Sequence, residues 1–456
     1  MLDLAIIVLY FICMIAVGFY VYRKRKASSS DGFFVANRSG TTLLILGSLC
    51  ATFIGASAVV GMAGLGYSRG LSGAWWLLVG AIGLFVLGFF LARRVRRFGL
   101  YTLPELVEKQ YDSRAGLATS ILIVIAWIAV IAGQIVAAGK ILSVILPYDQ
   151  SLLMVTTAAI FVLYTVLGGQ YSIIRTDVIQ FGILIIGILV SLGLVLSRVG
   201  GIGGLTASLP SDYVSFPVSI GFGWYDLIVF LVLTGSTYVV GPDIYARLFC
   251  ARDENVARSS ALWAGGVAIL VAFVIVLIGM GARVLFPAIS SEQAFPMVIE
   301  HILPVGVTGL VMAALLAAIM SSADTTLLTT STIVTQDVYK RLAPDMGERK
   351  TLLVSRVAVV VIGVLSVVVA LELKGIISSL FLAYTVFTSG VVVPVIAGFY
   401  KDKLKVNSIG ALSAIIGGGG TALVVRLLGV AYLELLGFAV CIVLLFGVSW
   451  MTGRNK

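Results

Sequence analysis

The residues best suited to chemistry lie in one apolar stretch between positions 305 and 326. Ser321, Asp324 and Thr325 have the spacing i, i+3, i+4, which places them on one face of a helix. Hydroxyl and carboxylate oxygens suit a hard cation, here a desolvated Na+, better than a soft metal. A second acid within an apolar segment is Asp177, and acids at membrane depth are costly and usually functional. Both acids are expected to face one inner cavity.

Each of these residues also has a structural interpretation. Hydroxyls inside a helix often donate to the carbonyl four residues earlier, and most threonines near Asp324 suit that role. Asp177 can cap the start of a helix after Thr176. Asp324 can pair with a basic residue, although its own apolar stretch contains none. The sequence leaves these alternatives open.

Catalytic motifs are sparse. His301 is the single histidine, and no H-E-x-x-H, G-x-S-x-G or G-x-x-x-x-G-K-[ST] motif occurs. The four cysteines lack metal-ligand spacing and are interpreted as small buried apolar residues. The sequence therefore predicts that the protein is not an enzyme and not an ATP-driven pump.

The composition explains why polar residues are so few. Of 456 residues, 60% are hydrophobic and 11% are charged, whereas soluble domains carry about 25% charged residues. We therefore expect a multi-pass protein of the cell membrane whose surroundings are the lipid bilayer. The net charge of +10 is assigned to loops facing the cytoplasm, so no nucleic acid and no obligatory protein partner is predicted.

Thirteen segments are long and apolar enough to cross a bilayer, which takes about 20 residues in a helix. Clusters of Lys and Arg after alternate segments predict an outside N-terminus and a cytoplasmic C-terminus. The approximate ranges are 3–22, 41–66, 72–92, 116–139, 150–167, 177–197, 225–246, 259–285, 305–326, 352–372, 376–399, 407–428 and 431–451.

Two of these segments contain helix-breaking residues. Glycines surround Thr52 and Ser57 in segment 41–66, and segment 225–246 includes Gly241-Pro242. Each opens a block of five segments, and five is odd, so the two blocks are inverted in the membrane. Matched broken helices in inverted halves indicate the binding site of a secondary transporter. Glycines that serve packing alone are the alternative.

Several stretches, in this order and at these spacings, resemble the sodium:solute symporter family, and the pattern is nearest to its proline and small-solute branch. They are Asp31–Ala36, Gly61–Tyr67, Arg175–Gln180, Pro242–Arg247 and Ala318–Lys340. The resemblance implies an all-α polytopic membrane protein of about 13 helices with a LeuT-type 5+5 inverted repeat.

The resemblance also divides the chain within a single membrane domain. A leading helix would occupy 1–26, a first five-helix repeat 41–197, an inverted second repeat 225–399, and two additional helices 407–451.

For coupling, the resemblance implies a main Na+ site made of the carbonyls of Ala51, Ile54 and Ala318 with the hydroxyls of Ser321 and Ser322. Independently, carbonyls released by a helix break and two adjacent hydroxyls would supply five neutral oxygens. The resemblance implies a second cation site at Asp177, Asp324 and Thr325. At that site Asp324 replaces the more usual serine. The sequence leaves open whether the site holds Na+, a proton, or a proton shared between the two acids.

The candidate solute residues flank the two breaks or lie on neighbouring segments: Gly55, Ala56, Ser57, Trp127, Gln134, Thr234, Gly235, Thr237, Tyr238, Thr385 and Thr388. These offer few donors and acceptors, so we expect Na+-driven import, by alternating access, of a small amino acid such as proline or a short carboxylate. A sodium-coupled sugar or vitamin symporter is the alternative. A transporter-like membrane sensor or a channel is the alternative of another class.

Overall fold

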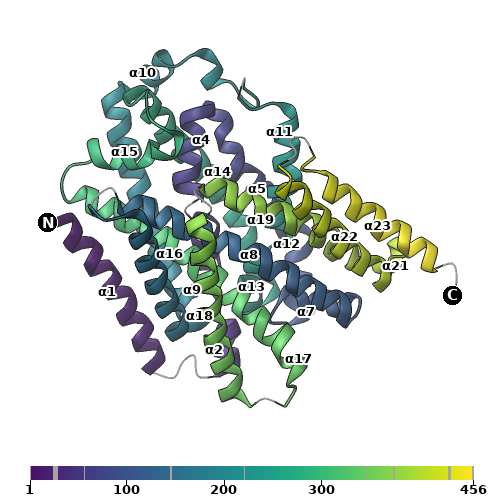
Figure 1. The fold of residues 1–456 in the computed structure, drawn as a ribbon. Coiled ribbons are helices and arrows are strands. Elements are labelled where there is room, and N and C mark those ends of the chain that lie inside the picture. Colours follow the sequence, from purple (N-terminus) through teal and green to yellow (C-terminus); the bar gives the residue numbers. More distant parts are fainter. Residues whose placement is uncertain are drawn as a thin grey trace.

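Figure 1 shows a bundle of helices in which α1 lies at one edge and the C-terminal pair α22 and α23 at the opposite edge. This is a computed structural model, and it describes residues 2–23, 29–55, 57–143, 146–219, 221–345, 347–372, 375–429 and 433–453. These residues form no named strand and only two isolated bridges, at Gly40 with Ala251 and at Ser219 with Phe222.

The bounds of the elements follow in chain order. The first half contains α1 (Leu2–Arg23), α2 (Ser30–Val35), η1 (Ala36–Arg38), α3 (Thr42–Phe53), η2 (Ser57–Gly61), α4 (Met62–Arg69), η3 (Gly70–Ala74), α5 (Trp75–Val86), η4 (Leu87–Leu91), α6 (Ala92–Phe98), α7 (Leu103–Gln110), α8 (Ser113–Leu142), α9 (Gln150–Val199), α10 (Gly201–Ser208) and η5 (Ser211–Val214). The second half contains α11 (Trp224–Val229), η6 (Phe230–Gly235), α12 (Ser236–Val240), α13 (Pro242–Cys250), α14 (Glu254–Leu285), η7 (Ser291–Gln293), α15 (Ala294–His301), α16 (Val307–Ile333), η8 (Val334–Tyr339), α17 (Lys340–Leu342), α18 (Glu348–Glu372), α19 (Ile376–Phe387), η9 (Thr388–Val392), α20 (Val393–Gly398), α21 (Lys401–Leu404), α22 (Ser408–Leu427) and α23 (Leu436–Gly453).

Ten helices of the described residues are long and apolar enough to cross a membrane. Two of them, Ala58–Arg97 and Gln150–Val199, have 40 and 50 residues, which is far more than one crossing of about 20 residues requires. Each changes direction at a glycine with positive φ: Gly70 (φ 64°) in the first and Gly169 (φ 54°) in the second. The total of thirteen spans stays a prediction, as do the repeat boundaries and the orientation of the termini.

Both predicted helix interruptions are present. The first falls between α3 and η2, where Ile54 adopts φ −92° and ψ 53°. The second separates α12 from α13 at Gly241, whose ψ of 132° is extended, and Pro242 then starts the next helix. Glycine tolerates the turn and proline cannot donate a helix hydrogen bond, so the local sequence accounts for both breaks.

Helix α16 carries most of the candidate site and is the most enclosed of the long helices. All residues from Val311 to Ile333 are buried, because α16 packs against α1, α3, α8, α9 and α18. Its threonine hydroxyls mostly donate to their own helix, as Thr326, Thr330 and Thr332 each do to the carbonyl four residues earlier. The structural interpretation of most threonines is therefore confirmed.

Close approach of backbones also shapes the bundle where α4 meets α14. A Cβ atom added to Gly279 would lie 1.9 Å from the carbonyl oxygen of Ala63. Small residues such as glycine allow the backbones of two membrane helices to come this close together. One turn of α14 is thus tied by packing to the segment that follows the first break.

We expect Gly279→Ala to lower the Tm of the purified protein in detergent, because α4 or α14 must move and overpacking costs about 1–3 kcal/mol. The matched control is Gly266→Ala in the same helix, where no atom lies within 4 Å of the added Cβ. That variant should keep or raise the Tm, since alanine favours helix over glycine by about 1 kcal/mol. Equal Tm values for the two variants would contradict the close packing.

Candidate cation and solute site

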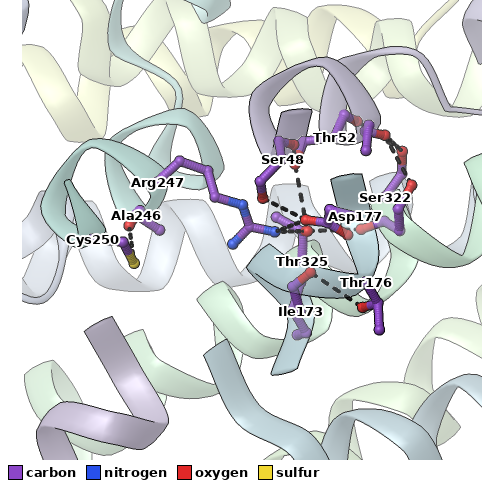
Figure 2. A network of polar contacts seen from close by, with 12 residues as sticks. Ser48, Thr52, Ile173, Thr176, Asp177, Ala246, Arg247, Cys250, Ser322 and Thr325 are labelled. Atoms are coloured by element: carbon purple, nitrogen blue, oxygen red, sulfur yellow. Dashed lines mark hydrogen bonds and ion pairs between the residues drawn. The ribbon is translucent and has the colours of Figure 1, made fainter. Parts of the chain in front are cut away.

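A cluster of oxygens forms where the end of α3 meets the middle of α16. The Ser321 hydroxyl donates to the carbonyls of Ala51 and Ala318, at 2.9 Å each. The Ser322 hydroxyl donates to the carbonyl of Thr52 at 2.7 Å and to that of Ala51 at 3.2 Å. Two hydroxyls and three carbonyls thus converge at the break, and the link from Ser322 to Thr52 is visible in Figure 2.

The structure brings together four of the five residues predicted for the main Na+ site, namely Ala51, Ala318, Ser321 and Ser322. Ile54 is buried at the end of α3, beside this group in sequence, and its carbonyl stays a predicted ligand. Sequence reasoning missed the Thr52 carbonyl. The break itself was readable from the glycines, but which carbonyl it aims at Ser322 depends on the backbone angles.

The chemistry of this oxygen cluster suits a monovalent cation. All of its oxygens are neutral and hard, which is the ligand type that alkali and alkaline-earth ions prefer. The described residues contain no group of three or more His, Cys, Asp or Glu side chains able to hold a metal ion. A divalent or transition-metal centre therefore has no support in that part of the chain.

The predicted second cation site has a different arrangement from the expected one. Asp177 does not cap a helix, because it lies well inside α9 with only 1% of its surface exposed. Its carboxylate accepts a hydrogen bond from Ser48 and forms an ion pair with Arg247, whose Nη2 lies 3.2 Å from Oδ2. The Nη2 group also donates to the Thr325 hydroxyl. Figure 2 shows these groups pointing toward one another.

Two features of this cluster go beyond the sequence analysis. Arg247, which directly follows segment 225–246, is fully buried in α13. It pairs with Asp177, whereas Asp324 accepts from the Thr165 hydroxyl at 3.0 Å. That both acids face one cavity stays a prediction. No local pattern indicates the pairing, since Arg247 lies 70 residues from Asp177.

A small cavity lies beside the oxygen cluster, between the two broken helices and α8, α16 and α19. Its open volume is about 30 Å³, far below the 300–1,000 Å³ typical of ligand pockets, so the side chains close around it. Its lining consists of Thr52, Phe53, Trp127, Val130, Gln134, Thr237, Tyr238, Asp243, Ile244, Ser322, Thr326 and Tyr384.

Four of the predicted solute residues line this cavity: Trp127, Gln134, Thr237 and Tyr238. The Trp127 Nε1 group is buried and has no hydrogen-bond partner among the described residues. A buried donor without a partner is uncommon, so this one is available to a solute acceptor.

Four other predicted solute residues, all among the described residues, do not line it. Gly55 packs under Ser322, since a Cβ there would lie 2.2 Å from Oγ. Gly235 serves packing, because its carbonyl oxygen would lie 2.3 Å from a Cβ on Gly83. Thr385 and Thr388 donate to the carbonyls of Phe381 and Leu233.

Three predicted solute residues remain. Thr234 is buried and its carbonyl accepts from Thr237. Ala56 lies outside the described residues, and for Ser57 only the backbone is described.

The cavity includes residues that the sequence interpretation did not select. Tyr384 lines it in place of its neighbour Thr385, and Asp243 contributes a carboxylate from the first turn of α13. Phe53 and Tyr238 form an edge-to-face pair across it, with ring centroids 5.9 Å apart. The adjacency of Pro242 and Asp243 at a predicted break was an available signal for the acid, but the direction of the tyrosine was not readable.

Comparison with known proteins identifies the family. The model of the sodium:solute symporter family matches residues 33–418. A sodium/glucose cotransporter of Vibrio parahaemolyticus is 29% identical over 417 residues, which cover 82% of this chain and 76% of that protein. Sodium/myo-inositol cotransporter 2 of Sus scrofa is 28% identical, covering 80% of this chain and 60% of that protein. This chain thus spans less than two thirds of the length of that animal relative.

Solved structures share the fold. A substrate-bound, outward-open Na+-coupled sialic acid symporter has a TM-score of 0.82 at 20% identity, covering 99% of this chain and 98% of that chain. A nucleobase-cation-symport-1 family transporter in a closed conformation has a TM-score of 0.62 at 14% identity, covering 92% and 93%. At these identities the likeness shows the fold alone, and it confirms the predicted all-helical LeuT-type class. The family model matches most of the length of the chain. The chain therefore belongs to the sodium:solute symporter family, whose members are transporters and not enzymes.

Proposed function

We propose that the protein is a Na+-coupled symporter of a small, neutral, polyhydroxylated solute such as a sugar or a cyclitol. Na+ as coupling ion follows from the family. The relatives that match over four fifths of this chain are named sodium/glucose and sodium/myo-inositol cotransporters. They favour the sugar alternative over an amino acid or a short carboxylate, and nothing in the comparisons supports the proline branch.

The observation that carries the choice of solute is the lining of the small cavity. It combines the rings of Phe53, Trp127 and Tyr384 with polar groups and the Asp243 carboxylate. Mostly apolar walls with a few placed polar groups are typical of small-molecule sites. A carboxylate in the wall accepts hydrogen bonds from solute hydroxyls and repels a solute that carries its own carboxylate.

For the coupling ion we propose the oxygens of Ala51, Thr52, Ala318, Ser321 and Ser322, with Ile54 as the remaining predicted ligand. The serine hydroxyls now direct their protons at the carbonyls. To bind Na+, the two hydroxyls would turn their protons away from these carbonyls, so that their lone pairs and the carbonyl oxygens are free for the ion. The cation would thereby hold the end of α3 against α16.

Coupling would arise because the ion site and the solute cavity share residues. Thr52 and Ser322 belong to the oxygen cluster and also line the cavity. An ion that fixes these two residues shapes the wall of the cavity before the solute arrives. By thermodynamic linkage the solute must then raise the affinity for Na+ by the same factor.

The solute class is tested by thermal shift of the purified protein with glucose, galactose, myo-inositol, proline and pyruvate, each in NaCl and in choline chloride. A ligand that binds only the native state raises its stability by RT ln(1 + [L]/Kd). We expect stabilisation by at least one of the polyhydroxylated compounds, and only in NaCl. Stabilisation by proline or pyruvate alone would contradict the proposed solute class and leave Na+ coupling standing.

Removing both hydroxyls of the ion site should weaken Na+ binding. We expect Ser321→Ala/Ser322→Ala to raise the Na+ concentration for half-maximal uptake at least about tenfold, which corresponds to about 1.4 kcal/mol. The matched control is Thr330→Val, which removes a buried hydroxyl of the same helix that donates to its own backbone. Unaltered Na+ dependence in the double variant, with folded protein present, would refute the assignment.

Trp127→Phe should raise the KM for the transported solute about two- to tenfold, the value of one lost hydrogen bond. The ring remains while the unpaired Nε1 donor is removed. Trp263→Phe serves as control, since Trp263 is exposed and is not among the residues that line the cavity. A lower KM in Trp127→Phe would show that the indole donor stays unsatisfied when the solute binds.

A further inference from the structure

Two candidate membrane spans end at one open cavity, far from the ion and solute sites. The helix Ala58–Arg97 ends there within α6, and the helix Ile376–Gly398 ends there shortly before α21. The cavity has a volume of about 580 Å³, which is within the range of ligand pockets. Because membrane helices end where the hydrocarbon core gives way to lipid head groups, we expect this cavity at the depth of the head groups.

The lining of this cavity carries more positive than negative charge. Its charged members are four basic residues and one acid: Arg94, Arg97, Lys401, Lys403 and Asp402. Glu254, which is not part of the lining, pairs with Arg97 at 2.8 Å. Two positive charges stay in excess when that pair is counted, so the cavity favours an anion.

Two of the basic groups have no acceptor in the described part of the chain. Lys401 donates to the Gln110 carbonyl at 3.0 Å, whereas the side chains of Arg94 and Lys403 form no ion pair or hydrogen bond with a described residue. Arg94 lies over the Tyr400 ring, with Cζ 4.9 Å from the ring centroid. A contact with the ring uses none of the N–H donors, so the fork of Arg94 stays free for a bidentate acceptor such as phosphate.

Exposed aromatic rings adjoin these basic groups. Phe98 lines the cavity, is 40% exposed and forms an edge-to-face pair with Phe399, with ring centroids 6.2 Å apart. Phe90, four residues before Arg94 in the same span, is 63% exposed. A soluble anion would gain nothing from these rings, whereas the acyl chains of a lipid would pack against them. The combination therefore favours a lipid over a free anion.

We propose that this cavity binds the phosphate group of an anionic phospholipid, with Arg94 and Lys403 as its ligands. Basic pockets between membrane helices are suited to such head groups. Arg94 belongs to the third predicted span and Lys403 to α21, so the phosphate would link two segments that are distant in the sequence. The inference concerns the surrounding membrane and does not depend on which solute the protein transports.

The test is a lipid titration of the purified full-length chain in a non-ionic detergent, with the Tm as readout. One series receives phosphatidylglycerol, and the other receives phosphatidylcholine, whose head group has no net charge. Since a ligand of the native state raises its stability, we expect the Tm to rise with phosphatidylglycerol and not with phosphatidylcholine. An equal response of the wild-type protein to both lipids would overturn the inference.

Two double variants that remove the same charge test the site itself. Arg94→Gln/Lys403→Gln should raise the phosphatidylglycerol concentration that gives half of the Tm rise at least about fivefold, the value of one basic residue near an anionic surface. Arg93→Gln/Lys405→Gln removes neighbouring charges outside the lining and should leave this concentration unchanged. Equal shifts in both variants would show attraction by overall charge and refute the site. Lys403→Gln alone serves as the test if the double variant does not fold.

Free phosphate is the other source of the same chemical group. Sodium phosphate and glycerol 3-phosphate, added without lipid, are expected to act equally on wild type and on Arg94→Gln/Lys403→Gln, because they have no acyl chains. A rise in Tm with either compound that this variant abolishes would assign the cavity to a soluble phosphate. That result would overturn the lipid as its ligand.

Discussion

A helix that breaks inside a membrane releases carbonyl groups that only protein, water or an ion can satisfy. In this protein the break after Phe53 is met by Ser321 and Ser322 of α16, whose hydroxyls reach the carbonyls of Ala51 and Thr52. The position of α16 at the centre of the bundle follows from this requirement as well as from its apolar residues. These hydroxyls satisfy the free carbonyls when no ion is bound. They can also give up those hydrogen bonds, so that the carbonyls become available to an ion, and reversible ion binding requires both arrangements.

The same contacts connect the proposed ion site to the proposed solute cavity. Ser322 and Thr52 belong to both, so a rearrangement of one would be felt by the other. The second broken helix contributes the opposite wall through Thr237, Tyr238 and Asp243. The cavity has only about 30 Å³ of open space, so its side chains lie close to one another.

The buried pair of Arg247 and Asp177 shows how the protein manages charge at this depth. Two ions removed from water are costly, and their mutual attraction repays that cost only with well-placed partners. Ser48 and Thr325 supply these partners from α3 and α16. The pair therefore joins α9 and α13 to α3 and α16, the two helices that hold the oxygen cluster. Arg247 is thus part of the polar interior of the folded protein.

The sequence by itself determined the membrane class, the helical architecture, the two breaks and the serine pair of α16. Hydropathy, glycine and proline positions and helical spacing are properties of neighbouring residues, so they can be read locally. Only the tertiary structure decided that Thr52 offers its carbonyl, that Tyr384 lines the cavity while Thr385 bonds its own helix, and that Arg247 pairs with Asp177. These outcomes depend on side-chain directions next to a break and on which helices pack together. Ala51 and Ser322, which are 271 positions apart, meet at the site, and no local pattern encodes such contacts.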